Sequence, residues 1–432
     1  MRIAFLRPGM TRRPSSDALQ PLIFSVIAAL TPADVEITFH DGMIGALPEV
    51  IDADAVAITV QTFTARHAYE IADRHRQRGI PVILGGYHPS ACPAEAAEHA
   101  DAVVVGEAED TWPAVLADLA AGRLRPRYDS TNHNEPAPAP AVAPFDRRHY
   151  PPLGVVQFSR GCRYTCDFCS IHAFYGRNIR TRPVEAIVAE VAARPEKLLF
   201  FVDDNLFADR QNARRLFEAL VPVRKRWVCQ ISMDVAEDAD LLRLMRRAGC
   251  LMVLIGFESL DRDNLKQMRK GANLRAGDYD RVIATVKRAG LMIYGTFVIG
   301  YDHDTADTAG RIRDFATGHG FSIANFNPLM AMPGTGLFDR LRDEGRLLHD
   351  RWWLAEQYRY GDAMYVPAAM SPEQLTASCR EARFGFYSAR SIARRALANA
   401  GSPMRLGVHL AANHISGREI RAKQGALLGE HR

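Results

Sequence analysis

Short apolar runs alternate with segments of helical spacing along the first part of the chain. The runs that indicate strands are Arg2–Leu6, Ala55–Val60, Pro81–Leu84 and Asp101–Val105. The helical patterns are Leu19–Leu30, Thr64–Gly79 and Trp112–Leu119. Strands that alternate with helices predict an α/β fold, here a doubly wound, Rossmann-like parallel sheet over residues 1–124. Such sheets bind their ligands beyond the carboxyl ends of the strands.

A proline-rich segment separates this region from a second alternating one. Residues 125–152 contain seven prolines, which indicates an extended linker. Residues 153–335 predict about six βα units and therefore a partial (β/α)6 barrel, with its active site at the carboxyl ends of the strands. The strands expected there are Val155–Phe158, Leu198–Val202, Val228–Ser232, Met252–Phe257, Ile293–Ile299 and Ile323–Asn327. Residues 336–432 predict a mostly helical carboxyl-terminal region.

Composition narrows the class of protein. Hydrophobic residues make up 47% and charged residues 24% of the chain, as in soluble globular proteins, and no run of eighteen apolar residues predicts a membrane span. Met1–Leu6 is followed at once by Arg7-Pro8-Gly9, so we expect a strand and not a secretory signal. The seven cysteines are odd in number and three lie within eight residues, which favours a cytoplasmic protein with a metal cluster over a disulfide framework.

Positive charge gathers at the carboxyl-terminal end. The segment from Arg380 to Arg432 holds ten Lys and Arg but three Asp and Glu, a local charge of +7 that leaves −3 for the rest of the +4 chain. One interpretation is a solvated basic helical tail. The other is a surface for an acidic substrate or for peripheral contact with anionic lipid.

Three cysteines form the most specific motif of the chain. Cys162, Cys166 and Cys169 follow a predicted strand with the spacing C-x3-C-x2-C. Thiolates are the usual ligands of iron–sulfur cubanes, and three of them leave the fourth iron open to a small molecule. A closed electron carrier normally uses four ligands. A structural zinc site of these cysteines with His172 is the alternative.

The residues Cys162, Cys166, Phe168 and Cys169 match the pattern C-x3-C-x-aromatic-C, and the chain here resembles the radical S-adenosylmethionine (SAM) superfamily. The resemblance implies a [4Fe–4S] cluster whose open iron chelates SAM, with Phe168 near the adenine. One electron from an external reductant such as flavodoxin or ferredoxin then cleaves SAM and gives a 5′-deoxyadenosyl radical.

Further strand ends of the barrel carry polar or glycine residues in the order that this family shows. The SAM contacts implied by the resemblance are Asp203, Asp204, Asn205, Ser232, Asp234, Glu258 and Gly300. For Asp203, Asp204 and Asn205 the alternative role is to cap the helix that follows.

The first region resembles the cobalamin-binding domain that precedes the barrel in a large radical SAM subgroup. The resemblance is carried by Leu84-Gly-Gly-Tyr-His-Pro89 and by Ala102–Glu109, and it implies cobalamin contacts from Gly85, Gly86, His88, Gly106 and Glu107. No histidine lies in a D-x-H-x-x-G motif. The domain is therefore expected to bind cobalamin without a protein imidazole on cobalt, or else to have lost the cofactor. A hydrogen-bonded loop histidine is the alternative for His88.

These resemblances favour cobalamin-dependent methyl transfer to an unactivated carbon of a lipid or natural-product substrate. Radical cyclisation, oxidation or rearrangement without methyl transfer is a second hypothesis, and a non-catalytic electron carrier or redox sensor is a third. No nucleic-acid partner is expected, because tRNA methylthiotransferases of this type carry a second three-cysteine set in the first domain, where this chain has only Cys92.

Overall fold

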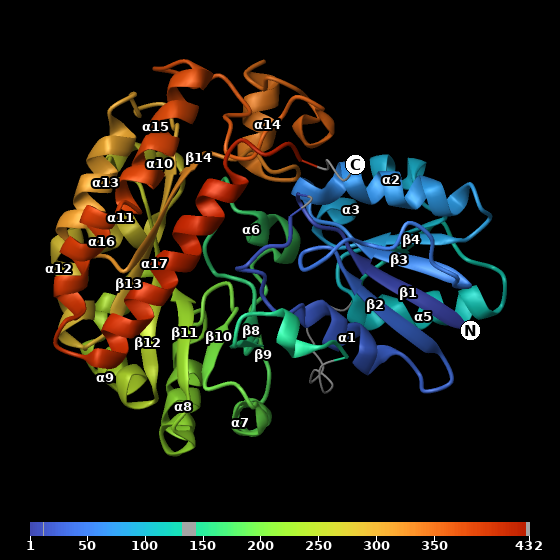
Figure 1. Cartoon of the computed structure of the whole chain (residues 1–432), viewed down its shortest axis with the longest axis horizontal. Coiled ribbons are helices and arrows are strands. Elements are labelled where there is room, and N and C mark those ends of the chain that lie inside the picture. The colour runs from blue at the N-terminus through green and yellow to red at the C-terminus, as the bar shows by residue number, and fades with distance from the viewer. Residues whose placement is uncertain (12, 132–143, 429–432) are drawn as a thin grey trace.

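Two six-stranded parallel sheets form the two lobes of the molecule (Figure 1). The computed structural model describes residues 1–11, 13–131 and 144–428. The amino-terminal sheet has the order β2-β1-β3-β4-β5-β6, and every pair of neighbours is parallel. Its strands are β1 (Arg2–Arg7), β2 (Glu36–Asp41), β3 (Ala55–Thr59), β4 (Val82–Gly85), β5 (Ala102–Val105) and β6 (Arg127–Asp129).

Helices cover both faces of this first sheet, as a doubly wound fold requires. They are α1 (Leu22–Leu30), α2 (Ala65–Arg76), α3 (Tyr87–Ala91), α4 (Pro93–Glu98) and α5 (Ala108–Ala120). Phe24 of α1 and Trp112 of α5 meet the ring of Phe5 edge to face, while α2 lies on the opposite face (Figure 1).

Two strands at the edges of this sheet were not predicted. No residue of β2 is fully buried, so its apolar pattern is weak. The strand β6 lies within the segment predicted as a linker and pairs with β5 from Val103 to Val105. Residues 132–143 of the predicted linker lie outside the described residues.

The second sheet has the order β14-β13-β12-β11-β10-β7, again all parallel. Its strands are β7 (Leu153–Val156), β10 (Leu198–Phe201), β11 (Arg226–Ile231), β12 (Cys250–Glu258), β13 (Met292–Ile299) and β14 (Ile323–Pro328). The helices between them are α6 (Ser170–Tyr175), α7 (Val184–Ala193), α8 (Arg210–Leu220), α9 (Ala239–Arg247), α10 (Arg262–Gln267), α11 (Gly271–Ala276), α12 (Tyr279–Arg288) and α13 (Thr308–Gly318). The edge strands β7 and β14 do not pair, so the sheet is the partial barrel that the sequence predicts.

The carboxyl-terminal region packs against the edge strand of this barrel. It consists of α14 (Gly336–Asp343), α15 (Pro372–Phe386), α16 (Ala389–Ala396) and α17 (Pro403–Lys423), and α15 and α17 both contact β14. Part of the predicted basic tail is buried here. The Arg395 guanidinium is fully buried and donates to the carbonyls of Phe321 and Phe386. The tail is therefore not simply a solvated surface. No helix of the described residues has the length and apolarity to cross a bilayer.

Ion pairs join the two lobes. The hairpin of β8 (Ser159–Arg160) and β9 (Arg180–Thr181) presents two arginines to the carboxyl end of β5. Arg160 lies 2.6 Å from Glu107 and 2.5 Å from Glu109, and Arg180 lies 2.6 Å from Glu107. Burial weakens solvent screening of these pairs, so the geometry of the hairpin depends on them.

We expect Arg160→Met to destabilise the protein by about 3 kcal/mol, because it leaves two largely buried carboxylates with one guanidinium fewer. The measurement is the urea midpoint of unfolding. Arg148→Met is the control, since its pair with Asp146 is exposed, and a loss within about 1 kcal/mol is expected. Equal losses for both variants would contradict a structural role for the buried pairs.

Candidate cofactor sites

The three-cysteine loop connects β8 to α6, beyond the carboxyl end of β7. Cys166 is buried, whereas Cys162 and Cys169 are half-buried. Gly161 precedes the loop with φ +87°, and a Cβ there would collide with the carbonyl oxygen of Asn178. Glycine is therefore required at this position, because any side chain would push the cysteine loop away from the hairpin.

Two carboxylates at the end of β10 hold the backbone that leads into the cysteines. Asp203 accepts hydrogen bonds from the amide of Phe158 at 3.2 Å and from the Ser159 hydroxyl at 2.6 Å, and also from the Ser159 amide. Asp204 accepts from the Gly161 amide at 2.8 Å. Burial raises the pKa of Asp203 to about 7. Asp203 was predicted to contact SAM, but its hydrogen bonds here go to the loop.

Asn205 connects the cysteine loop to the next strand. Its amide nitrogen lies 3.8 Å from the Cys162 sulfur and 3.1 Å from the Ser232 hydroxyl. Ser232 in turn donates to Asp234, which also pairs with Arg163 at 3.1 Å and Arg210 at 2.8 Å. Burial opposes ionisation of Asp234, but the hydrogen bonds from Ser232 and Arg210 lower its pKa overall. The structure thus brings Asn205, Ser232 and Asp234 together beside Cys162.

Glu258 meets a lysine that sequence reasoning missed. Glu258 has φ +62° at a bulge near the end of β12, a strained conformation of the kind that collects at functional sites. Its carboxylate lies 2.6 Å from Lys270 Nζ. Although burial opposes it, the charges of Glu258 and Cys166 raise the pKa of Lys270. Lys270 follows α10 in an unremarkable polar stretch, so no motif marks it.

Lys270 also approaches the cysteine loop. Its ammonium lies 5.6 Å from the centre of the Phe168 ring, and its charge acts on both Cys166 and Cys169. Burial raises the pKa of Cys166 to about 11, and the nearby ammonium opposes that shift. A metal displaces such thiol protons outright, and the resulting thiolates would be stabilised by Lys270 and by the Asn205 amide.

The arrangement fits a cubane better than a single zinc ion. Across the described residues, no three His, Cys, Asp or Glu side chains converge on the position of one metal ion. His172 Nδ1 lies 3.3 Å from the Gly176 carbonyl instead. A [4Fe–4S] cluster binds each thiolate to a different iron, so its ligands need not converge on one point.

The predicted SAM residues Phe168 and Gly300 lie at the rim of the barrel. The Phe168 ring is 6.5 Å from that of Tyr301, edge to face. Gly300 has φ +120°, and its carbonyl accepts from the Tyr365 hydroxyl of the carboxyl-terminal region. A Cβ at Gly300 would collide with that hydroxyl. Gly300 therefore permits the close approach of the carboxyl-terminal region to β13.

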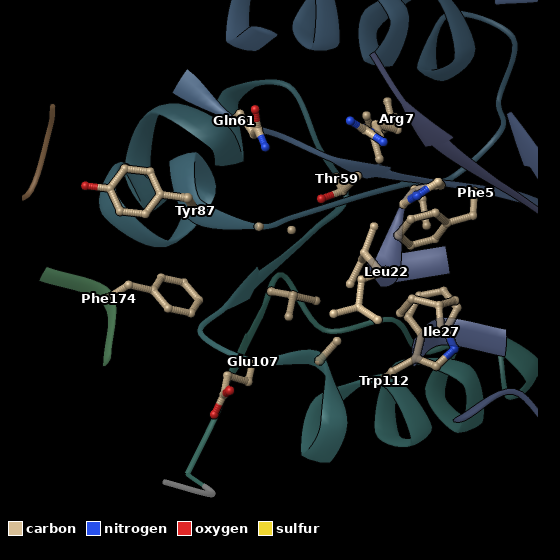
Figure 2. A pocket seen from close by; sticks show the side chains of 18 of the residues that line it. Phe5, Arg7, Leu22, Ile27, Thr59, Gln61, Tyr87, Glu107, Trp112 and Phe174 are labelled. Carbon is tan, nitrogen blue, oxygen red and sulfur yellow. The ribbon is translucent and has the colours of Figure 1, made fainter. Parts of the chain in front are cut away.

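A cavity of about 450 Å³ lies at the carboxyl edge of the first sheet, next to the second lobe. Figure 2 shows Arg7, Thr59 and Gln61 from the ends of strands on one side and Leu22, Ile27 and Trp112 from helices on the other. Phe174 of α6 also lines it, and its ring lies 6.2 Å from that of Tyr87. The cavity is thus largely apolar in its depth, and residues of both lobes line it.

The predicted cobalamin residues divide into two sets. Gly85, Gly86, Gly106 and Glu107 line the cavity. His88 does not line it; the ring is fully buried, with Nε2 3.0 Å from Glu95. Glu95 also accepts from Tyr69 at 3.0 Å and from Trp353 at 2.9 Å. No histidine is among the described residues that line the cavity, so they fit a cobalamin with no imidazole from the protein on cobalt.

The chain matches two family models. Residues 156–316 match the radical SAM superfamily and residues 18–116 match the B12 binding domain. Among solved structures, the methyltransferase TsrM from Kitasatospora setae, with cobalamin and a [4Fe–4S] cluster bound, has a TM-score of 0.64 over 98% of this chain and 99% of its own. The cobalamin-dependent SAM radical enzyme OxsB has a TM-score of 0.67 over 96% of this chain and 72% of its own. Their identities of 15% and 14% establish likeness of fold alone.

Three curated relatives are similar in sequence. Two are from Chlorobaculum tepidum: bacteriochlorophyllide d C-12(1)-methyltransferase, 29% identical over 87% of this chain and 84% of the relative, and bacteriochlorophyllide d C-8(2)-methyltransferase, 30% identical over 77% and 78%. The third is hopanoid C-2 methylase from Rhodopseudomonas palustris, 32% identical over 75% of this chain and 64% of the relative. The chain therefore belongs to the radical SAM superfamily, as an enzyme with a B12 binding domain before its barrel, and its cofactors are SAM, a [4Fe–4S] cluster and cobalamin.

Proposed function

We propose that the enzyme transfers a methyl group to an unactivated carbon of a small molecule, a lipid-like or natural-product substrate. One observation carries the proposal: Arg160 stands two residues before Cys162 and pairs with Glu107, which lines the 450 Å³ cavity. The proposed cluster site and the proposed cobalamin site are therefore adjacent, with the Arg160–Glu107 pair between them. The names of the relatives support methyl transfer over the other radical outcomes.

The residues around these two sites have separate roles in the proposed reaction. Cys162, Cys166 and Cys169 would bind three irons and leave the fourth for SAM. When bound, the cofactors supply a carbon-centred radical and a transferable methyl group. Asp203 and Asp204 fix the loop through its backbone amides. The aromatic rings of Tyr87 and Phe174 meet between the lobes and would help to keep water from the reacting centre.

We expect Cys166→Ala to abolish formation of 5′-deoxyadenosine from SAM, because two thiolates do not retain the cluster. Anaerobically reconstituted protein is reduced with dithionite and the product is measured by chromatography, with iron and sulfide analysis alongside. Cys92→Ala is the control and keeps the activity, since Cys92 lies outside the motif. Formation of 5′-deoxyadenosine by Cys166→Ala at the wild-type rate would overturn the assignment.

The cavity gives a second test. We expect Thr59→Trp to weaken cobalamin binding about tenfold or more, because an indole at the end of β3 fills the cavity at Thr59 (Figure 2). The change in the cobalamin absorption spectrum on titration measures the affinity. Thr38→Trp on the exposed side of β2 is the matched control.

Methyl transfer further requires that S-adenosylhomocysteine forms beside 5′-deoxyadenosine. Absence of S-adenosylhomocysteine under turnover would favour cyclisation, oxidation or rearrangement instead.

We also propose two partners. A flavodoxin or ferredoxin supplies the electron, and an amphiphilic substrate enters from an anionic membrane surface. Leu397, Met404 and Leu410 of the carboxyl-terminal region expose 76%, 37% and 48% of their surface. The exposed Arg390 and Arg394 lie on the adjacent helix α16. Apolar residues flanked by arginine match an anionic bilayer interface.

Liposome flotation tests the membrane contact. Wild-type protein is expected to float with phosphatidylserine vesicles and to remain unbound with neutral ones, and Leu397→Glu reduces the bound fraction because it places a negative charge at the interface. Leu348→Glu leaves flotation unchanged, because Leu348 is equally apolar and 41% exposed but lies outside α16, α17 and the turn between them. If the wild-type protein does not float with anionic vesicles, the proposed membrane contact is wrong.

A further inference from the structure

A second, smaller cavity lies inside the barrel, between β13, β14 and α17. Its volume is about 160 Å³, below the size that holds a whole drug-sized ligand, so it suits one functional group of a larger molecule. Figure 1 shows α17 crossing in front of the second sheet, and the helix contacts β14. The lining residues are Asp17, Tyr294, Asn325, Phe326, Asn327, Tyr360, Arg383, Ser416, Glu419, Ile420, Lys423 and Gln424.

The strands present polar side chains to this cavity. Phe297 packs on Phe315 of α13, so this side of β13 faces the outer helices. Because side chains alternate along a strand, Tyr294 points to the opposite side. Asn325 and Asn327 of β14 alternate in the same way with Phe326, which stacks on Phe297. The Asn325 amide donates to the Tyr294 hydroxyl at 2.8 Å. The barrel interior is therefore polar beside β14.

Arg383 is a buried cation in this cavity, and its hydrogen bonds to the described residues all go to neutral groups. Only 6% of the residue is exposed. Its guanidinium donates to the Phe326 carbonyl at 2.8 Å, to the Asn327 side-chain oxygen at 3.4 Å and to the Gln424 side-chain oxygen. None of these partners carries charge, and a buried charge is stabilised fully only when it meets its opposite.

The acidic residues of the cavity are engaged elsewhere. Asp17 lies 2.7 Å from Lys423, and Glu419 lies 3.2 Å from the same ammonium. Glu419 also accepts from the Ser16 amide at 2.8 Å. Lys423 thus pairs directly with two carboxylates, whereas no ion pair among the described residues involves Arg383. Gly361 has φ +92°, and a Cβ there would lie 2.8 Å from the Arg383 guanidinium, so glycine keeps that approach open.

Arg395 shows that burial alone does not make such a site. It is more deeply buried than Arg383, and carbonyls together with the Asn413 side chain surround its guanidinium. It does not line the cavity, and its role is to tie α16 to the start of β14. Arg383 differs because one side of its environment is open space inside the barrel.

We propose that Arg383, with Asn327 and Gln424, forms a subsite for a carboxylate group of the substrate. A guanidinium binds carboxylate through two parallel hydrogen bonds, and neighbouring amides can donate to the same oxygens. The subsite selects substrates that carry an acid side arm and disfavours neutral polycyclic hydrocarbons, which would leave the cation unpaired. The proposal depends on the proposed function only in that the ligand is called a substrate.

Thermal unfolding of the reconstituted full chain with a small probe tests the subsite. Propionate is expected to raise the midpoint, and propionamide at matched ionic strength is not, because only the anion pairs with Arg383. Arg383→Gln weakens the propionate effect about tenfold or more in apparent affinity. Arg380→Gln is the matched control: this arginine is exposed on the same helix, and its variant keeps both the propionate response and SAM cleavage.

A second variant guards against simple misfolding of Arg383→Gln. Asn327→Asp supplies the missing anion from the chain itself, so it is expected to raise the unfolding midpoint and to abolish the propionate response. Equal shifts with propionate and propionamide, or an unchanged propionate response in Asn327→Asp, overturn the subsite. Absence of 5′-deoxyadenosine from wild-type protein that still responds to propionate overturns the proposed function and leaves the carboxylate site standing.

Discussion

The buried ion pairs of Arg160 and Arg180 with Glu107 and Glu109 are the constraint on which the arrangement of the two lobes depends. The arginines belong to a short hairpin next to the cysteine loop, and the glutamates follow β5 at the edge of the B12 binding domain. Because these charges are shielded from solvent, they favour one relative placement of the lobes. The proposed methyl transfer draws on cofactors held by both lobes, so it needs that fixed placement.

Around this contact, carboxylates serve mainly as supports for the backbone. Asp203 and Asp204 accept from amides that precede Cys162, and Asn205 reaches the Cys162 sulfur. Lys270 adds a positive charge next to Cys166, balanced by Glu258. Hydrogen bonds and net charge near the sulfurs tune the potential of an iron–sulfur cluster, so these residues are suited to set how readily a bound cluster accepts its electron.

The carboxyl-terminal region encloses the barrel interior beside β14 and also contributes charged side chains to it. Helix α17 and the loop before α1 meet through Glu419, Lys423 and Asp17, which encloses the interior beside β14. Arg383 reaches into that interior from α15. The basic residues of the carboxyl-terminal tail therefore have three different environments. Some are buried structural cations, one faces the cavity, and others are exposed on α16.

The sequence alone determined the class of both sheets and the identity of the cysteine motif. Local information suffices for these, because strand and helix patterns are short in range and the three cysteines lie within one loop. The weakly patterned edge strands β2 and β6 were missed because their burial is partial. Only the tertiary structure could place Lys270 beside Cys166, tie His88 to Glu95 away from the cavity, and set Arg160 between two glutamates. His88 and Glu95 are only seven residues apart, but the fold decides which way the ring points. The contacts of Lys270 and Arg160 join segments that are remote in sequence, and no local pattern encodes which charges become buried together.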